Sequence, residues 1–576
     1  MRVTLGNFHE TIQYLSGRSE IGADSETTGL EYTDRPFALI LGDRERVFYF
    51  DERELTPSFW REPALKALLL EDKVWVFQNA KFDMMMLERM GLTMGGAIHD
   101  IAVMARIKDN TFLSYSLENQ SKRAGGEQKS DVVKAYIKEH DLYETRTSHL
   151  GETYQVPCYH KVPIEIMEAY AVQDVVATLS LWDKYVSEMD SGDMAVFNNE
   201  AKLTRVCYAM ERRGICVDKE YTKKAYEDES KKVADLKAQF QMSTGLEYIN
   251  SADHLCPIFE KIGEKVHVTK KGSPSLTDDI LEMYTTPLAK LVQEIRFYDK
   301  RISTYFKPYL EKVDPAGKLH PWMWQAGTRT GRFSYSDPNL QNIPKEEASD
   351  TKVRRCIVPS KGNIFLSFDY SQMEYFLMVA YANELQVIKQ IMQGVDFHQA
   401  TADLLGVPRK QAKTLNFAIL YGAGLDKIAH MLGCTRDEAK RLKVKYFLAL
   451  PRVESLVKNI IDTGKKRGYV INWLGRKLRS EWEFCYALPN HLIQGGGADI
   501  VKVAMSRLQD AGLCEGLCLQ IHDQLVWDVP ERWARDNYAK IKEILEDVWE
   551  KNGVRLRVDA SYSAKSLAEE DMAKWI

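Results

Sequence analysis

Several features that would assign a chain to a specialised class of protein are missing from this sequence. Its nine cysteines are scattered and include no Cys-x-x-Cys pair, so we expect neither a zinc site nor a disulfide framework, which fits a reducing cytoplasm. No apolar stretch reaches about 18 residues, and the first residues lack the apolar core of a signal peptide, so no membrane association is expected. Low-complexity segments and regular repeats are also absent.

The composition is that of an ordinary soluble globular protein. Of the 576 residues, 45% are hydrophobic and 28% are charged, and this length allows several domains with substantial cores. Because the formal net charge is only −4, the chain has no global basic field, and a polyanionic partner has to be held by local clusters of cations. Each candidate cluster could equally be a solvated face. The clusters are 296/300/301, 352/354/355, and 465/466/467 with 476/477/479.

Two apolar segments end in an aspartate, and these ends are the strongest indication of chemistry. Residues 364–368 lead into Asp369, and residues 517–521 lead into His522 and Asp523. The second segment continues into another apolar run, which predicts a β-hairpin with His522 and Asp523 at its turn. Two carboxylates on rigid strands can hold two divalent cations around a phosphoryl group, so phosphoryl transfer on nucleotides is the first hypothesis. The alternative is that each aspartate only ends a strand and meets water.

Cations and aromatic rings recur at every fourth position between the two aspartates. This spacing keeps them on one stripe of a helix, while Ala412, Leu415 and Ala418 fall on another face. A nucleoside triphosphate lying along such a helix would meet cations at its phosphates and rings at its base, and His398 is a further candidate phosphate donor. An amphipathic helix with snorkelling cations is the alternative. The stripe consists of Arg409, Lys413, Phe417 and Tyr421.

Five segments resemble, in order, the motifs of family A DNA polymerases, the group of bacterial DNA polymerase I. Three of them are Asp369-Tyr-Ser-Gln-Met-Glu374, Arg409-x3-Lys413-x3-Phe417-x3-Tyr421-Gly422 and Gln520-Ile-His-Asp523. The other two run from Thr328-Arg-Thr-Gly-Arg332 to Pro344 and from Asn490-His-Leu-Ile-Gln494 to Asp499.

The resemblance implies a role for each motif residue. Asp369 and Asp523, with the backbone carbonyl of Tyr370, would hold two Mg²⁺ ions, for which Mn²⁺ can substitute. Glu374 would crowd the 2′ carbon of the sugar, so that a ribose hydroxyl clashes. Phe417 would pack on the incoming sugar and base, and a Phe there predicts discrimination against dideoxynucleotides. The residues expected to bind the dNTP are Arg409, Lys413, Phe417, Tyr421, His398, Glu374 and Gln372.

A further group of motif residues is expected to contact primer-template DNA near the newest base pair. On the minor-groove side both A·T and G·C pairs offer acceptors, so such contacts check shape without reading sequence. Two positions depart from the family pattern: Gln524 stands where Glu is usual, which weakens a metal-holding or water-holding role, and Phe376 stands where Arg is usual. The expected DNA-binding residues are Arg332, Gln341, Asn490, Gln494 and His522.

A second active site is expected in the first third of the chain. Asp24 and Glu26 end an apolar segment at i and i+2, hence on one face of a strand. Asp83 follows another apolar run, and Tyr170 and Asp174 share one side of a predicted helix. Together these residues resemble the proofreading 3′→5′ exonucleases that use four carboxylates and one tyrosine. The resemblance implies that the four acids hold two metal ions and that the tyrosine orients the attacking water.

The resemblance also implies a fold and its layout. We expect a ribonuclease H-like α/β exonuclease domain at 1–190, followed by an α+β right-hand polymerase domain at 191–576. Within the latter, the thumb would span about 200–318, the fingers about 385–455, and the palm about 319–384 and 456–576. The exonuclease begins almost at residue 1, so no separate 5′ nuclease domain is expected. This compact layout resembles a phage replicative enzyme working in the host cytoplasm.

The expected partners are primer-template DNA and dNTPs. A helicase, a single-strand binding protein and a processivity factor are replisome partners that the motifs do not identify. The segment 108–163 is either a partner surface or a loop-rich edge of the exonuclease.

Three other functions stay open at this point. A single-subunit RNA polymerase would have a similar palm with two metal-binding aspartates, although Glu374 and the upstream exonuclease argue against this function. Reverse transcription is compatible with the motifs, because the same residues do not reject an RNA template. A non-catalytic DNA-binding subunit should have lost Asp369 or Asp523, and both are present.

Overall fold

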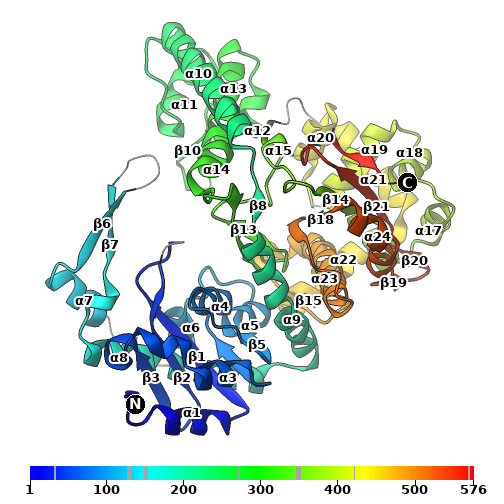
Figure 1. The fold of residues 1–576 in the computed structure, drawn as a ribbon. Helices are drawn as coiled ribbons and strands as arrows, with labels where there is room; N and C mark the ends of the chain where they lie inside the picture. The colour runs from blue at the N-terminus through cyan, green and yellow to red at the C-terminus, as the bar shows by residue number, and fades with distance from the viewer. Residues whose placement is uncertain are drawn as a thin grey trace.

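The computed structural model consists of an N-terminal α/β unit, a helical arm and, as predicted, a C-terminal α+β unit (Figure 1). The N-terminal unit, drawn in blue, lies at the opposite end of the view from the arm, drawn in green. Within the part of the chain that the structure describes, no helix is both long and apolar enough to cross a membrane. The described residues are 1–31, 34–125, 132–147, 153–269, 271–344, 352–420, 422–568 and 571–575.

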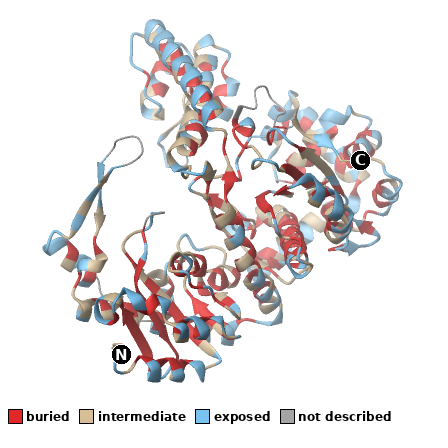
Figure 2. Cartoon of the chain, in the orientation of Figure 1, coloured by how far each residue is buried: buried red, intermediate tan, exposed pale blue. Residues whose placement is uncertain are grey.

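A five-stranded mixed sheet in the order β3-β2-β1-β4-β5 forms the centre of the N-terminal unit. The central strand β1 (Glu20–Thr27) runs antiparallel to β2 (Pro36–Gly42) and parallel to β4 (Val74–Phe77). The strands β3 (Val47–Asp51) and β5 (Ala97–Asp100) form the edges. Every residue of β2 and β3 is buried, as expected for a sheet covered on both faces, and Figure 2 shows this buried centre in red. The predicted α/β architecture is confirmed.

Helices surround this sheet, and a hairpin extends from it. The long helix α8 (Ile164–Glu188) packs along β1 and carries two of the predicted exonuclease residues. The hairpin of β6 (Tyr143–Thr147) and β7 (Thr153–Pro157) projects from the unit (Figure 1). The other helices are α1 (Phe8–Ser16), α2 (Glu52–Leu55), η1 (Pro57–Arg61), α3 (Pro63–Leu70), α4 (Ala80–Arg89), α5 (Ile101–Lys108), α6 (Leu117–Arg123), α7 (Val132–Glu139) and η2 (Tyr159–Lys161).

The segment 108–163 combines short helices and a hairpin with connecting loops, so its interpretation as a loop-rich edge stays open. Its described residues form α6, α7 and the β6–β7 hairpin. Arg146 fixes the hairpin to the loop after β1 by donating two hydrogen bonds of 2.8 Å to the Asp34 carboxylate. Residues 126–131 and 148–152 of this segment lie outside the described residues. Its use as a partner surface stays a prediction.

The helix α9 (Ser191–Arg213) joins the N-terminal α/β unit to the C-terminal α+β unit. It packs against α5 and β5 on one side and against α23 (Leu488–Asp510) on the other. Asp190 caps its first turn by accepting a hydrogen bond of 2.9 Å from the Asp193 amide. The junction is thus a packed helix rather than a flexible linker.

A buried network of ions fixes α9 to the C-terminal unit. The Arg476 guanidinium lies 2.7 Å from Glu200 Oε1 and 2.6 Å from Asp499 Oδ1, and both acids are fully buried. Lys502, equally buried, binds Glu200 and donates to the Gln325 carbonyl at 2.6 Å. Because an unpaired charge is costly inside a protein, each member depends on the others. Arg476, which belongs to one of the cationic clusters selected from the sequence, is therefore a structural residue.

The helical arm rises from the base of the C-terminal unit (Figure 1). Its two long helices, α10 (Lys219–Thr244) and α13 (Pro287–Arg301), pack side by side around their own apolar core. Arg301, another member of a selected cluster, is buried and pairs with Glu229 across these helices at 2.7 Å. The rest of the arm comprises β8 (Ile215–Cys216), α11 (Ala252–Lys261), β9 (His267–Val268), β10 (Pro274–Ser275), α12 (Asp278–Met283), the π-helix η3 (Ile302–Phe306), α14 (Lys307–Lys312) and β11 (Lys318–Leu319).

An antiparallel sheet in the order β17-β18-β14-β21-β22 forms the centre of the C-terminal unit. The strand β14 (Ile364–Tyr370) lies between β18 (Gln524–Val529) and β21 (Val558–Ser563). The strand β17 (Leu517–Ile521) joins β18 through a two-residue turn, so the predicted hairpin is present. The edge strand is β22 (Ala573–Lys574).

Helices and short hairpins surround this second sheet. The helices are α15 (Lys352–Arg355), α16 (Met373–Ala382), α17 (Leu385–Met392), α18 (Phe397–Leu405), α19 (Arg409–Leu420), α20 (Leu425–Leu432), α21 (Arg436–Ala449), α22 (Pro451–Arg467), η4 (Trp482–Ala487) and α24 (Glu531–Glu546). The short strands are β12 (Trp322–Trp324), β13 (Ser334–Ser336), β15 (Tyr469–Ile471), β16 (Lys477–Arg479), β19 (Glu550–Lys551) and β20 (Val554–Arg555).

Candidate active sites

The two aspartates predicted to act together lie side by side at one end of the C-terminal sheet. Asp369 pairs with Gln524 across β14 and β18, which places it next to the turn that carries Asp523. The Tyr370 amide donates to the Asp523 carbonyl at 3.3 Å and ties the end of β14 to this turn. His522 adopts a φ of 55°, a left-handed conformation suited to a tight turn. The strand register therefore brings together residues far apart in the sequence.

Gln341 holds this turn from outside the sheet. Its Oε1 accepts from the His522 amide at 2.9 Å, and its Nε2 donates to Gln520 Oε1 at 2.6 Å. The side chain is only 7% exposed, so it acts as a rigid support for the turn. The sequence analysis expects Gln341 at the DNA. That contact stays a prediction, and the support of the turn is a role that sequence reasoning missed.

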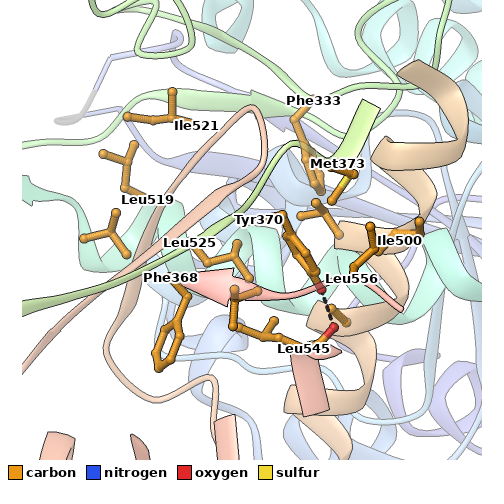
Figure 3. Packing of buried hydrophobic residues seen from close by; sticks show 14 of the residues in the cluster. Phe333, Phe368, Tyr370, Met373, Ile500, Leu519, Ile521, Leu525, Leu545 and Leu556 are labelled. Carbon is orange, nitrogen blue, oxygen red and sulfur yellow. Dashed lines mark hydrogen bonds between the residues drawn. The ribbon is translucent and has the colours of Figure 1, made fainter. Parts of the chain in front are cut away.

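The side chain of Tyr370 lies among the buried hydrophobic residues of the core (Figure 3). Its hydroxyl donates to the Leu545 carbonyl at 2.7 Å, and burial raises the pKa of the phenol. The ring thus anchors the end of β14 while the backbone stays beside Asp523. This arrangement fits the prediction that Tyr370 contributes its backbone carbonyl and not its hydroxyl.

The unusual Gln524 makes a specific contact. Its Nε2 donates to Ser367 Oγ at 2.6 Å, a hydrogen bond that a carboxylate could make only with the hydroxyl as donor. On the other side of β14, Asp559 of β21 stands opposite Asp369 and accepts a hydrogen bond from the Ser371 hydroxyl. Sequence reasoning missed this third carboxylate, although the alternation of polar and apolar residues in β21 places it on the same face as Asp369.

An acid that the sequence analysis did not select connects two of the predicted nucleotide-binding residues. Asp396 accepts from Arg409 Nε and Nη2, each at 3.0 Å, and from Gln372 Nε2 at 2.6 Å. It also caps α18 by accepting from the Gln399 amide at 2.8 Å. Burial alone would raise the pKa of Asp396, but the hydrogen bonds from Arg409 and the Gln399 amide outweigh it and lower the pKa. A triphosphate would therefore compete with Asp396 for Arg409.

His398 lies inside the packing between α18 and α19. It is 4% exposed, its ring meets Tyr375 edge-on at 4.6 Å, and its Nδ1 lies 3.1 Å from the Asn416 amide nitrogen. Burial lowers the pKa of the ring to about 4, so His398 is neutral at neutral pH. The structure thus offers a neutral imidazole rather than a cation. Its predicted contact with phosphate requires the ring to become accessible.

The proposed sugar gate is held by a predicted DNA-binding residue. Arg332 Nη2 donates to Glu374 Oε1 at 2.5 Å, and both side chains are partly buried. On the facing helix α19, Lys413 and Phe417 are half-buried, and the Phe417 ring lies 5.2 Å from that of Tyr375. Tyr421 lies outside the described residues.

The remaining predicted DNA contacts lie on the first turns of α23. Asn490 and Gln494 are both half-buried and one turn apart. The Asn490 side-chain oxygen is buried and has no hydrogen-bond partner among the described residues. A buried acceptor without a partner is costly, which fits a group that awaits a ligand.

Three of the predicted exonuclease acids converge in the N-terminal unit. Asp24 and Glu26 on β1 and Asp174 on α8 each offer a carboxylate oxygen, and these oxygens all lie within 4.8 Å of one another. All three side chains are partly exposed. Such a set of hard oxygen ligands is suited to Mg²⁺ or Mn²⁺.

Asp83 and Tyr170 lie beside these acids, Asp83 in a buried position and Tyr170 half-buried. Asp83 is 2% exposed and accepts from Ser25 Oγ at 2.7 Å. Burial, followed by the charge of Asp24, raises the pKa of Asp83 well above its usual range. Burial also raises the pKa of Tyr170, with further contributions from Glu26 and Asp174, so its hydroxyl keeps its proton. Tyr170 can therefore donate a hydrogen bond in the site.

Asp100 is a supporting residue of this site that sequence reasoning missed. Its carboxylate accepts from the amides of Asn79 and Ala80, each at 3.0 Å, and from the Ala102 amide at 2.8 Å. The first two bonds fix the start of α4, whose first turn carries Asp83, and the third caps α5. The only signal in the sequence is an Asp at the end of a short apolar segment, which is too common to select.

Comparison with known proteins places both parts of the chain in established families. Residues 4–190 match the 3′-5′ exonuclease family, and residues 219–568 match DNA polymerase family A. The DNA polymerase of Mycobacterium phage L5 is 27% identical over 553 residues, which cover 92% of this chain and 89% of the phage protein. The DNA polymerase I of Chloroflexus aurantiacus is 29% identical over 516 residues, 84% of this chain but only 53% of that protein.

A solved structure has the same fold over nearly the whole length. The POL domain of Pol1 from M. smegmatis, in complex with DNA primer-template and dNTP, superposes with a TM-score of 0.82 at 23% identity. The match covers 98% of this chain and 99% of that one.

The fold and the two carboxylate sites thus define a two-site enzyme that acts on nucleic acid. The chain belongs to DNA polymerase family A. It is a DNA-directed DNA polymerase with an N-terminal 3′-5′ exonuclease domain, as the motifs predicted.

Proposed function

We propose that this polymerase extends the 3′ end of a primer with dNTPs on template DNA and removes mismatched 3′ ends at its exonuclease site. The observation that carries the polymerase half is the register that places Asp369 beside the Asp523 turn. The exonuclease half is carried by the converging oxygens of Asp24, Glu26 and Asp174. Relatives matched over nine-tenths of this chain include a phage DNA polymerase, which supports a role in phage DNA replication.

Each site is proposed to hold two Mg²⁺ ions, for which Mn²⁺ can substitute. Asp369, Asp523 and the Tyr370 carbonyl would be the ligands at the polymerase site, and the four exonuclease acids would be the ligands at the other. When bound, the ions activate the attacking oxygen and stabilise the charge that develops on the leaving group. The chemistry of the donors fits, because every candidate side-chain ligand is a carboxylate.

The nucleotide is proposed to lie along α19. Arg409 and Lys413 would bind the triphosphate, aided by His398, and Gln372 would hold Asp396 in place as Arg409 exchanges partners. Phe417 would cover the sugar and base, and Tyr421 would complete this surface. Glu374, oriented by Arg332, would leave no room for a 2′ hydroxyl, so ribonucleotides are excluded by shape.

The primer-template is proposed to contact the C-terminal unit close to the newest base pair. Asn490, with its unpartnered oxygen, and Gln494 would face the minor groove, and Arg332, Gln341 and His522 would contact or support the primer end. In the exonuclease site, Tyr170 would orient the attacking water through its protonated hydroxyl. Replisome partners such as a helicase, a single-strand binding protein or a processivity factor are further proposals.

We also propose the domain division expected from the motifs. The exonuclease domain would span 1–190 and the polymerase domain 191–576, a division supported by α8 ending at Glu188 and α9 beginning at Ser191. The arm would be the thumb, at about 200–318. The helices from α17 to α21 would be the fingers, at about 385–455, and the sheet with its flanking segments would be the palm.

The decisive experiment follows a 5′-labelled primer with a 3′ mismatch in the presence of Mg²⁺, with and without dNTPs. Wild type should first shorten and then extend the primer. Asp24→Ala should lose the shortening but extend a matched primer, and Asp369→Ala should lose extension but keep shortening. If a matched primer never grows with wild type, the C-terminal unit only holds DNA and the proposal is wrong.

A further inference from the structure

The segment η4 exposes three aromatic side chains that the active sites do not use. Trp482, Phe484 and Tyr486 are 64%, 50% and 56% exposed, and we call them the aromatic platform. Between them, Cys485 is fully buried in a small apolar cluster beneath α22 and α23. Because Cys485 anchors the segment, the rings are held outward on a fixed base. The Phe484 and Tyr486 rings lie 6.4 Å apart, and exposed aromatic rings gathered on one segment are candidates for a binding surface.

The platform adjoins the proposed nucleotide and template sites. Tyr486 lines a cavity of about 610 Å³ together with Ile419 and Gly422 at the end of α19 and Pro489 at the start of α23. Pro489 immediately precedes Asn490, which is proposed to contact the newest base pair. This cavity, which α21 and α22 also line, thus connects the platform through Tyr486 to the end of α19 and the start of α23.

The charges around the platform suit a nucleic acid strand. Lys465 Nζ lies 5.2 Å from the centre of the Trp482 ring, and Lys466 and Arg467 follow it at the end of α22. Two acids lie in the same segment: Glu481 is paired with Arg329 at 3.2 Å, and Glu483 is exposed between Trp482 and Phe484. The three cations at the end of α22 outnumber them. Proteins commonly bind unpaired nucleic acid by stacking its bases on aromatic rings and pairing its phosphates with nearby cations.

We propose that the aromatic platform stacks the unpaired bases of the template strand ahead of the newest base pair. The inference rests on the polymerase activity proposed above and adds a binding site to it. Stacking does not depend on base identity, because every base has a flat face, so the platform would hold any template sequence. Its effect would be to keep the approaching template single-stranded and ordered.

The test measures how binding depends on the length of the unpaired template. Wild type should bind a primer-template with an overhang of about six nucleotides about tenfold more tightly than one with a single unpaired nucleotide. The double variant Trp482→Ala/Phe484→Ala should lose this gain while binding the short overhang like wild type. With an overhang of abasic sugar-phosphates, the affinity of wild type should fall to that of the variant, because such an overhang keeps the phosphate charges but has no bases to stack.

Two matched variants separate stacking from damage to the fold. Trp482→Phe/Phe484→Tyr keeps two rings and should keep the gain, whereas Phe112→Ala removes a ring that is 42% exposed on the N-terminal unit and should change nothing. Equal melting temperatures would show that all variants are folded. Failure of the polymerase proposal would appear separately, as absent extension on the short overhang.

The inference is overturned if wild type binds both overhangs equally, or if the double Ala variant keeps the gain. It is also overturned if the abasic overhang binds wild type as tightly as the normal one, because phosphate contacts would then be sufficient. A double Ala variant that dissociates into monomers, with its overhang dependence unchanged, would assign the platform to a contact between two copies of this chain.

Discussion

Replacing Glu200 by Gln tests whether the buried ion network holds the two units together. The amide keeps the size and an acceptor oxygen of the carboxylate but removes its charge. Arg476 would keep Asp499 as a partner, whereas Lys502 would lose the only acid within ion-pair distance among the described residues. The variant would therefore leave a fully buried ammonium group beside a guanidinium.

The expected cost follows from this geometry. Removing one partner of a buried ion pair typically destabilises a protein by about 3–5 kcal/mol. In a domain of about 150–250 residues, each kcal/mol lowers the Tm by about 2–4 °C, so the transition of the C-terminal unit should fall by about 10 °C. The matched control is Glu227→Gln, which breaks a 3.9 Å pair between Lys223 and a 62% exposed carboxylate. Such surface pairs contribute only about 0–1 kcal/mol.

The pH dependence of the loss provides a second measurement. Burial lowers the pKa of Lys502, and the charge of Glu200 opposes this effect, so the pKa should fall further in the variant. A lysine whose pKa is lower in the folded state binds fewer protons there than when unfolded, so stability rises with pH between the two pKa values. The deficit of Glu200→Gln should therefore shrink from about pH 7 to about pH 9.

Calorimetry of both variants across this pH range would check the reasoning. Two variants with the same Tm at pH 7 would refute the claim that the network stabilises the junction. A large loss of Tm that does not change with pH would still support a stabilising role for the network, but it would show that Lys502 retains its proton over this pH range.

Three further changes probe the active sites. Gln524→Glu should add charge at the metal site and lower the Mg²⁺ concentration for half-maximal extension by roughly tenfold, whereas Gln524→Ala, which only removes the bond to Ser367, should not. Arg332→Ala should remove the 2.5 Å hydrogen bond that orients Glu374, so that kcat/KM for dNTPs falls about tenfold and ribonucleotides are rejected less well. Unchanged discrimination between dNTPs and ribonucleotides would contradict this. Asp100→Ala should slow excision by about tenfold with extension unaffected, because the start of α4 loses two acceptor contacts and the start of α5 loses one. Equal slowing of both activities would instead indicate general unfolding.

The strongest features of the sites could be predicted from the sequence. A strand that ends in an acid is a local pattern, and the apolar runs around Asp369 and Asp523 were sufficient to predict both strands and the hairpin. The convergence of Asp24, Glu26 and Asp174 followed from combining three weak patterns with a known family. In each case the side chain that carries the chemistry also lies within the pattern that reveals it.

The supporting residues could not be predicted, because their partners are remote in the sequence. From the sequence, Arg476 and Arg301 are predicted to be surface cations. In the structure, the packing of helices places Glu200 beside Arg476 and Glu229 beside Arg301. The sequence predicts that Gln341 contacts DNA, whereas in the structure its side-chain amide forms hydrogen bonds with the turn at His522, which is remote in the sequence. Burial of a polar residue depends on such tertiary partners and leaves no periodic signal.

The position of α9 bears on how this enzyme could be shortened. A polymerase without proofreading is a useful reagent, and the family match, which begins at residue 219, invites a cut just before it. Such a cut would delete α9 and with it Glu200, so that Lys502 would lose its acidic partner and Arg476 would keep only Asp499. A cut just before Asp190 would preserve both the helix cap and the pairs of 2.6 Å and 2.7 Å that Lys477 makes with Asp190 and Asp193. The smallest stable polymerase therefore starts a full helix earlier than sequence similarity alone would place it.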